Sequence, residues 1–284
     1  MPRVSKNLIK ADAAEVRVAL CQMTPEPANV QANLAKVVAA VEALADSSDL
    51  IVLPECALTG YMLTADEAGG VAESIPGQVT KVLTTLARER NVMLIAGMLE
   101  RRGSALHNIA LLCDRDGEVY VYRKSHLPRM GVDRWCVPGS DGFYPFKTTL
   151  GKLGIEICYD FRFPEPSRLL ALRGSELLVL IAAWPVTATD YPEFINRCRA
   201  AENRVAVVAA ACAGEERGTR YLGRSQIIRA DGSVVAEAGS DPTVLTASLS
   251  KPGTGSNRHV LGRPDGPGGL LADRRPELYA AVMG

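Results

Sequence analysis

Residues 177–182 read Leu-Leu-Val-Leu-Ile-Ala, a short and unbroken apolar run. Such a run fits a β-strand that is buried on both faces, as in a parallel sheet covered by helices. The segments 165–172 and 193–203 on either side show the apolar spacing of amphipathic helices. A buried strand between two helices is typical of an α/β domain, in which helices cover one or both faces of a sheet.

The same alternation of strands and helices continues in both directions. Asp-Gly turns at 114–117 and 231–232 each separate two short strand-like runs and predict two hairpins. Each half of the chain thus has strand–helix units followed by a hairpin, which favours a two-sheet core with outer helices. We expect further strands at 16–23, 50–53, 92–99, 109–113, 118–122, 151–157, 205–211, 226–229, 233–237 and 244–249, and helices at 29–44 and 78–90.

Composition narrows the classes of protein to which the chain can belong. Of its 284 residues, 47% are hydrophobic and 23% are charged, which supports a packed core. Lys plus Arg and Asp plus Glu number 32 each, so no basic excess indicates a nucleic-acid partner. The longest apolar run, 177–186, is far below the ~20 residues that span a bilayer, so no membrane association is expected.

Two features favour a cytoplasmic location. The N-terminal segment MPRVSKNLIKADAAEV lacks the apolar stretch of a secretory signal. The seven cysteines are scattered and form no Cys-x-x-Cys pair, so we expect reduced thiols.

The C-terminal segment differs in composition from the rest of the chain. Eleven of the 34 residues at 251–284 are Gly or Pro. We therefore expect one domain over residues 1–250, followed by an extended tail that packs on the body or on a partner subunit. A loose C-terminus is the alternative.

Three polar residues stand at the ends of predicted strands, where α/β sheets place their ligands. Glu55 follows a buried strand, and partial burial would raise its pKa and make it a proton shuttle at neutral pH. Lys124 leaves a hairpin strand, where an ammonium can hold an oxyanion or a carboxylate. Cys158 ends a strand before a helix, whose amides favour a thiolate. Taken alone, each has a structural alternative: a helix cap, a solvated lysine and a small core residue.

Together these segments resemble the carbon–nitrogen hydrolase (nitrilase) superfamily over residues 16–249. The three catalytic positions of that family match Glu55 in Leu-Pro-Glu, Lys124 in Arg-Lys-Ser-His-Leu and Cys158 in Ile-Cys-Tyr-Asp. The spacings of 69 and 34 residues also fit the family. Further similar segments are Arg-Phe-Pro-Glu at 162–165, Ala-Ala-Trp-Pro at 182–185 and Arg-Ala-Ala-Glu-Asn at 199–203.

The resemblance implies a four-layer αββα sandwich that pairs into a homodimer through the helices near 165–172 and 193–203. It implies neither a metal nor a cofactor. The residues after Cys158 are Tyr159-Asp160 rather than the Trp-Glu of nitrile hydrolysers. This pattern favours hydrolysis of a small primary amide, with an N-carbamoyl compound as the runner-up. A nitrilase and a non-catalytic binding module are the remaining alternatives.

The resemblance also implies a mechanism through a cysteine acyl-enzyme. Glu55 takes the thiol proton, Cys158 attacks the amide carbon, and Lys124 and the backbone N–H of Tyr159 hold the oxyanion. Glu55 returns the proton to the departing ammonia and then activates water, which releases the acid.

One departure from the family concerns a second glutamate, eight residues after the lysine. Val132 stands at that position, and Asp133 is next to it. Glu156 is another candidate, because it lies two residues before Cys158 and is expected on the same face of the strand. A salt-bridged or edge-exposed Glu156 is the alternative. Our hypothesis is that Asp133 supplies the second carboxylate.

Substrate contacts are less strongly encoded. We expect an apolar pocket lined by Tyr61, Met130, Trp135 and Trp184. Core packing is the alternative for Trp184. A substrate carboxylate would pair with an arginine such as Arg162, Arg129 or Arg134, unless these loop arginines are simply solvated.

Overall fold

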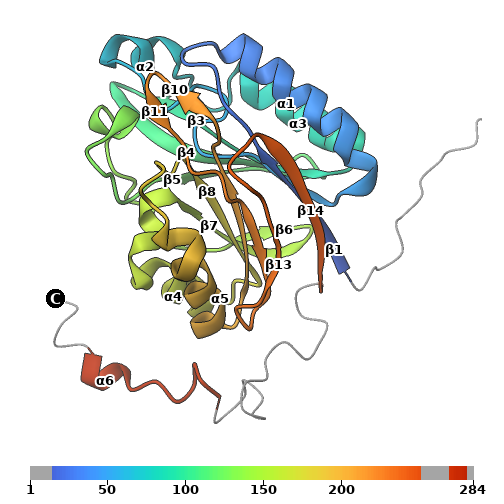
Figure 1. Ribbon diagram of the computed structural model, residues 1–284, viewed down its shortest axis with the longest axis vertical. Helices are drawn as coiled ribbons and strands as arrows, with labels where there is room; N and C mark the ends of the chain where they lie inside the picture. The colour runs from blue at the N-terminus through green and yellow to red at the C-terminus, as the bar shows by residue number, and fades with distance from the viewer. Residues whose placement is uncertain (1–14, 251–268, 280–284) are drawn as a thin grey trace, which may run out of the picture.

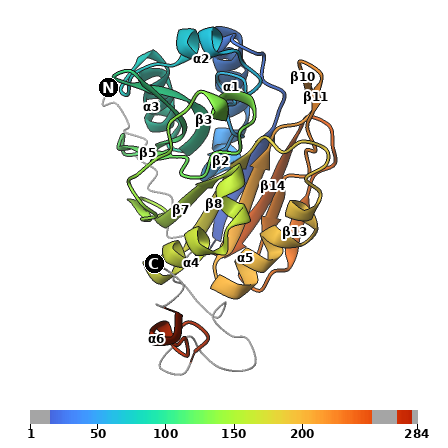
Figure 2. The same cartoon turned by 90° about the vertical axis from the view of Figure 1, so that its left-hand side faces the viewer.

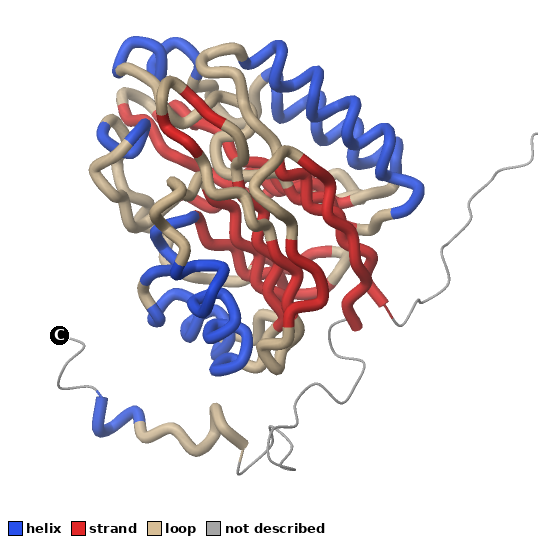
Figure 3. The backbone as a smooth tube through the Cα atoms, in the orientation of Figure 1, coloured by secondary structure: helices blue, strands red, loops and turns tan. Residues whose placement is uncertain are grey.

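The computed structural model describes residues 15–250 and 269–279. Two six-stranded sheets face each other, and helices cover their outer faces (Figures 1 and 3). The two outer helical layers lie at opposite sides of the molecule in the rotated view (Figure 2). The predicted αββα architecture is therefore confirmed.

The first sheet has the strand order β14-β1-β2-β3-β4-β5. Its inner pairs β1–β2 and β2–β3 are parallel, and the remaining pairs are antiparallel. Two long helices cover its outer face, and a short helix, α2, contacts β3. The elements are β1 (Glu15–Gln22), β2 (Leu50–Val52), β3 (Met93–Arg102), β4 (Ala105–Cys113), β5 (Val119–Arg123), β14 (Thr243–Ser250), α1 (Val30–Leu44), α2 (Ala65–Val71) and α3 (Gln78–Arg90).

The second sheet has the strand order β13-β12-β9-β8-β7-β6. Its inner pairs β7–β8 and β8–β9 are parallel, and two helices pack on its outer face. The elements are β6 (Phe146–Thr148), β7 (Gly151–Ile157), β8 (Leu177–Ala182), β9 (Ala206–Ala211), β12 (Gln226–Ile228), β13 (Val234–Glu237), α4 (Pro164–Leu172) and α5 (Asn196–Asn203).

Short helical turns and one small hairpin connect these layers. The turns are η1 (Ala45–Ser47), η2 (Gly131–Arg134), η3 (Cys158–Arg162) and the π-helical η4 (Tyr191–Ile195); the hairpin is β10 (Glu215–Glu216) with β11 (Thr219–Arg220); and a last helix is α6 (Pro276–Tyr279).

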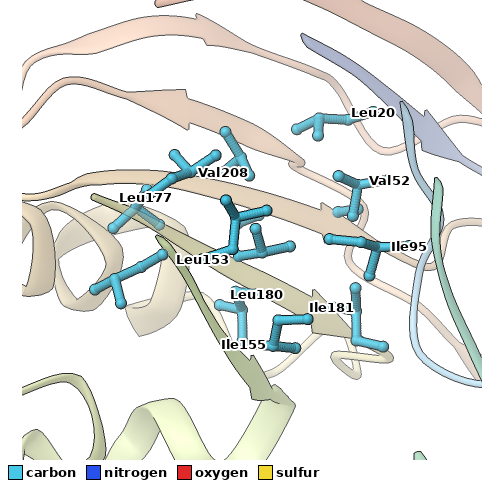
Figure 4. Packing of buried hydrophobic residues seen from close by; sticks show 14 of the residues in the cluster. Leu20, Val52, Ile95, Leu153, Ile155, Leu177, Leu180, Ile181 and Val208 are labelled. Atoms are coloured by element: carbon cyan, nitrogen blue, oxygen red, sulfur yellow. The ribbon is translucent and has the colours of Figure 1, made fainter. Parts of the chain in front are cut away.

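The main core lies between the two sheets. Side chains of the first sheet alternate: on β2, Leu50 and Val52 face the second sheet, whereas Ile51 packs beneath the outer helices. Figure 4 shows Val52 and Ile95 opposite Ile181 of β8. All six residues of β8 are buried, as the apolar run at 177–182 predicts.

The structure confirms both predicted hairpins, β4–β5 and β12–β13, and corrects other details. The helix expected from residue 193 has a regular α-helical course only from Asn196. A wider π-helical turn precedes it, in which the Asn196 N–H bonds to the Tyr191 carbonyl. The last strand in chain order, β14, follows the strands of the second sheet but pairs with β1 of the first sheet. The local sequence pattern does not reveal this pairing. Helix α2 and strand β6 were not predicted, since both are short.

Most of the C-terminal tail expected at 251–284 lies outside the described residues. Within its described part, Arg274, Pro276 and Tyr279 line a hollow together with residues of α4. No helix in the described ranges is both long enough and apolar enough to cross a membrane.

Candidate active site

Glu55 follows β2 in a turn that packs closely against β3. The next residue, Cys56, has a left-handed backbone (φ 51°), and the Gly97 N–H donates to the Pro54 carbonyl at 3.1 Å. A Cβ at Gly97 would lie 2.3 Å from the Cys56 backbone nitrogen, so glycine is required there. This close approach fixes where Glu55 leaves its strand.

Lys124, which follows β5, lies between two buried carboxylates. Its Nζ donates to Glu55 Oε1 at 2.7 Å and to Asp133 Oδ2 at 2.6 Å. All three side chains are shielded from solvent. We call Glu55, Lys124 and Asp133 the ion cluster; with both carboxylates ionised it carries one net negative charge.

Asn108 on β4 ties the two carboxylates of the ion cluster together. Its Nδ2 donates to Glu55 Oε1 at 2.7 Å and to Asp133 Oδ1 at 2.9 Å. The Tyr61 hydroxyl adds a bond to Asp133 Oδ2 at 2.8 Å. Sequence reasoning missed Asn108, whose signal is a polar residue directly before the buried run at 109–113.

Cys158 begins η3 directly after β7, in a left-handed backbone conformation (φ 47°). The Asp160 carboxylate holds this turn, because it accepts bonds from the Ile157 N–H at 3.2 Å and from the His126 N–H at 2.8 Å. The strained turn takes Cys158 out of the regular strand and places it at the wall of a pocket.

The Ala183 amide, just after β8, connects the thiol to the ion cluster. It donates to Glu55 Oε2 at 2.8 Å and also neighbours the Cys158 thiol. Glu55 comes from the first sheet, whereas Ala183 and Cys158 follow strands of the second. The site is therefore assembled across the interface between the two sheets.

Electrostatics set the protonation of these groups. Burial raises the pKa of the Glu55 carboxyl above its usual range, although the Lys124 ammonium acts in the opposite direction. Burial alone would lower the pKa of Lys124, but Glu55 and Asp133 together hold it well above the ordinary value. Burial, reinforced by Glu55, holds the pKa of the Cys158 thiol well above its usual range. Cys158 is thus a thiol at neutral pH and needs a base.

The pocket beside Cys158 has a volume of about 440 Å³. Several residues that the sequence predicts at the site line this pocket: Tyr61, Met130, Tyr159, Arg162 and Trp184. Trp135 lines a different hollow, next to Leu63, whose carbonyl accepts the indole N–H at 3.0 Å.

Glu156 lies away from the ion cluster. Its carboxyl accepts a bond from Ser167 of α4 at 2.7 Å, so it faces the outer helices. The expectation that it shares a face with Cys158 is wrong, because the left-handed turn at Cys158 ends the strand alternation at Ile157. Burial raises the pKa of Glu156 to about 8. Of the two candidates for the second carboxylate, only Asp133 contacts Lys124.

No group of three or more His, Cys, Asp or Glu side chains within residues 15–250 and 269–279 is arranged to hold a metal ion. The seven cysteines are all free thiols.

Comparison with known families gives one extensive match. Residues 17–258 match the family model described as carbon-nitrogen hydrolase. Among curated relatives, a nitrilase of Pyrococcus abyssi is 35% identical over 93% of this chain and 99% of its own. An omega-amidase of Xenopus laevis is 35% identical over 73% of this chain and 79% of its own.

Solved structures give a concordant match. A mutant of the amidase from Nesterenkonia sp. AN1, with the acetamide moiety of fluoroacetamide added covalently at its active-site cysteine, superposes with a TM-score of 0.80. It is 25% identical and covers 95% of this chain and 98% of its own.

The buried carboxyl of Glu156 predicts a pH-dependent stability. The folded protein keeps this proton up to about pH 8, whereas the unfolded chain releases it near its ordinary pKa of 4.5. The folded state therefore binds more protons in this window, and stability falls as pH rises through it. The free energy of unfolding of Glu156→Gln, relative to that of wild type, should therefore rise by about 2 to 3 kcal/mol from pH 6 to pH 9.

Urea unfolding at the two pH values measures this gain. Glu165→Gln, which replaces an exposed glutamate of α4, is the matched control and should follow wild type. A constant difference between wild type and Glu156→Gln at the two pH values would show that Glu156 is ionised in the folded protein.

Proposed function

Because the chain belongs to the carbon–nitrogen hydrolase family, we propose that it hydrolyses small primary amides, R-CO-NH2, to the carboxylic acid and ammonia through an acyl-enzyme on Cys158. The observation that carries this proposal is the arrangement of one thiol at a pocket wall, with a buried carboxylate and ammonium behind it. Hydrolysis of an amide bond is the activity that the family and its amidase members support. The choice of a primary amide rests on Tyr159-Asp160 after Cys158.

In the first half of the reaction, Glu55 accepts the proton of Cys158 and the sulfur attacks the amide carbon. The raised pKa of Glu55 suits this role, since a base is most effective when its pKa approaches the working pH. The amide oxygen becomes an oxyanion, held by Lys124 and the backbone N–H of Tyr159. Glu55 then returns the proton to the nitrogen, the C–N bond breaks, and ammonia leaves an acyl thioester.

In the second half, water takes the place of ammonia. Glu55 removes a proton from the water, and the hydroxide attacks the thioester carbon to form a second oxyanion. When the C–S bond breaks, the acid leaves and the thiolate recovers its proton from Glu55. The ion cluster thus ends the cycle with the charge that it had at the start.

Asp133 has a distinct part in this mechanism. It accepts a second bond from Lys124, at 2.6 Å, in addition to the one that Glu55 accepts, and is itself fixed by Tyr61 and Asn108. A lysine held at two points cannot follow Glu55 when that carboxylate takes up a proton. Asp133 therefore keeps the ammonium in position for the oxyanion, which is the task we assign to the second carboxylate.

The wider setting is also part of the proposal. Residues 1–250 form the hydrolase domain, and the tail packs on the body or on a partner. Helices α4 and α5 mediate a homodimer, a role supported by the exposed apolar side chain of Leu172. The protein works in the cytoplasm on small amides and has neither nucleic-acid nor membrane partners.

Ammonia release tests the proposed function directly. Wild type should release ammonia from short aliphatic amides faster than from N-carbamoyl amino acids or nitriles. The Cys158→Ala variant should be inactive, whereas Cys198→Ala, which removes an exposed thiol, should retain the wild-type rate. Mass spectrometry of wild type quenched during turnover should show the acyl group on the peptide that contains Cys158.

The other outcomes identify the other functions. Faster turnover of N-carbamoyl compounds would replace the primary amide by the runner-up substrate class, and faster turnover of nitriles would make the protein a nitrilase. Absence of turnover on every compound would indicate a binding module.

Loss of Asp133 tests the role of the second carboxylate. Asp133→Ala should lower kcat/KM for the best amide by about 100-fold, because Lys124 loses one of its two anchors. Asp141→Ala is a suitable control, since Asp141 is an exposed residue that pairs with Arg123. Full turnover in Asp133→Ala, measured as ammonia release, would refute this role.

A further inference from the structure

The pocket beside Cys158 contains one pair of opposite charges. Arg162 and Asp190 both line it, and their side chains form an ion pair. The other residues that line the pocket are uncharged, including Cys158, which is a thiol at neutral pH. The wall therefore carries a positive and a negative group side by side and no net charge.

We propose that Asp190, together with Arg162, selects amides that carry an ammonium next to a carboxylate, that is, the side-chain amides of α-amino acids. This inference rests on the proposed function, because it names the substrate class of the same pocket. Arg162 binds the substrate carboxylate and Asp190 binds the substrate ammonium. Each charged group of the substrate thus pairs with a group of opposite charge on the pocket wall.

The position of Arg162 suits contact with the far end of a short substrate. Cys158 and Arg162 are the first and last residues of η3. A 3₁₀ turn rises ~2.0 Å per residue, so the two backbone positions lie roughly 8 Å apart along its axis. A carboxamide at the sulfur can therefore place a charged group a few carbon atoms away beside the guanidinium.

The Asp190 side chain does not cap its own segment: Asp190 precedes η4, yet its side chain makes no capping bond to that turn. Its carboxylate is instead directed to Arg162, whose guanidinium lies 5.7 Å from the centre of the Tyr191 ring. The ring and the carboxylate together hold the guanidinium at the pocket wall, where both charged groups remain partly open to solvent.

Charge balance distinguishes this pocket from one built for a simple acid. An arginine without a partner would attract a lone carboxylate, as the sequence alone suggests for Arg162. Here Asp190 already neutralises that arginine and would repel a second carboxylate nearby. An added ammonium removes this repulsion by giving Asp190 a partner of its own. Asp190 thus favours the zwitterion over the acid.

Four amides of similar chain length separate these cases. They are L-glutamine with both charges, glutaramic acid with the carboxylate only, 4-aminobutyramide with the ammonium only, and butyramide with neither. For wild type, we expect kcat/KM for L-glutamine to exceed that for each of the others by about 10-fold or more.

Removal of the negative charge of Asp190 should change the order of kcat/KM among these amides. In Asp190→Asn, kcat/KM should fall for L-glutamine and rise for glutaramic acid, because Arg162 is then free to bind a lone carboxylate. The ratio between the two substrates should change by about 10-fold or more. The matched control is Glu193→Gln, three residues after Asp190. It also removes one negative charge, but from an exposed side chain that pairs with Arg224. Its ratio should equal that of wild type.

The outcomes separate this inference from the proposed function. Turnover of butyramide by wild type without preference for L-glutamine overturns the inference and leaves amide hydrolysis standing. A uniform change on all four substrates in Asp190→Asn also overturns it. If wild type releases no ammonia from any of the four amides or from shorter ones, the proposed function fails and the inference fails with it.

Discussion

The buried ammonium of Lys124, held between Glu55 and Asp133, is the interaction on which the rest of the site depends. Ions excluded from water are costly unless every charge has a partner with good geometry. Here the partners come from several elements: the Ala183 amide follows β8, Asn108 lies on β4, and the Tyr61 hydroxyl lies in the loop after β2. Removal of any of these donors would leave a buried carboxylate with one hydrogen bond fewer, so the cluster requires the surrounding elements to meet in one arrangement.

The fold meets this requirement through the packing of its two sheets. Val52 precedes the turn to Glu55, and Ile181 lies two residues before Ala183; both belong to the core between the sheets (Figure 4). The apolar packing that stabilises the sandwich therefore also brings the carboxylate of one sheet to the amide and thiol of the other. Gly97 completes this arrangement, because it lets β3 approach the Glu55 turn.

Much of this could be predicted from the sequence, for identifiable reasons. Apolar runs and Asp-Gly turns are local signals, and they predicted the strand–helix order and both hairpins. Residues after strand ends are natural site candidates, which is why Glu55, Lys124 and Cys158 stood out. Asn108 was missed because its role depends on the register between strands. Glu156 was misplaced because strand alternation ends at the left-handed turn of Cys158. The Arg162–Asp190 pair joins residues 28 positions apart, which no local pattern reveals.

The central claim is that the ion cluster supplies, through Glu55, the base that activates the Cys158 thiol. The rate of iodoacetamide alkylation at Cys158, followed by peptide mass spectrometry at pH 7, tests it most directly. The exposed thiol of Cys198 is an internal reference in the same sample. In Glu55→Gln, alkylation of Cys158 should slow by about 100-fold or more relative to wild type, while Cys198 reacts at an unchanged rate. Equal rates at Cys158 in the two proteins would contradict the account.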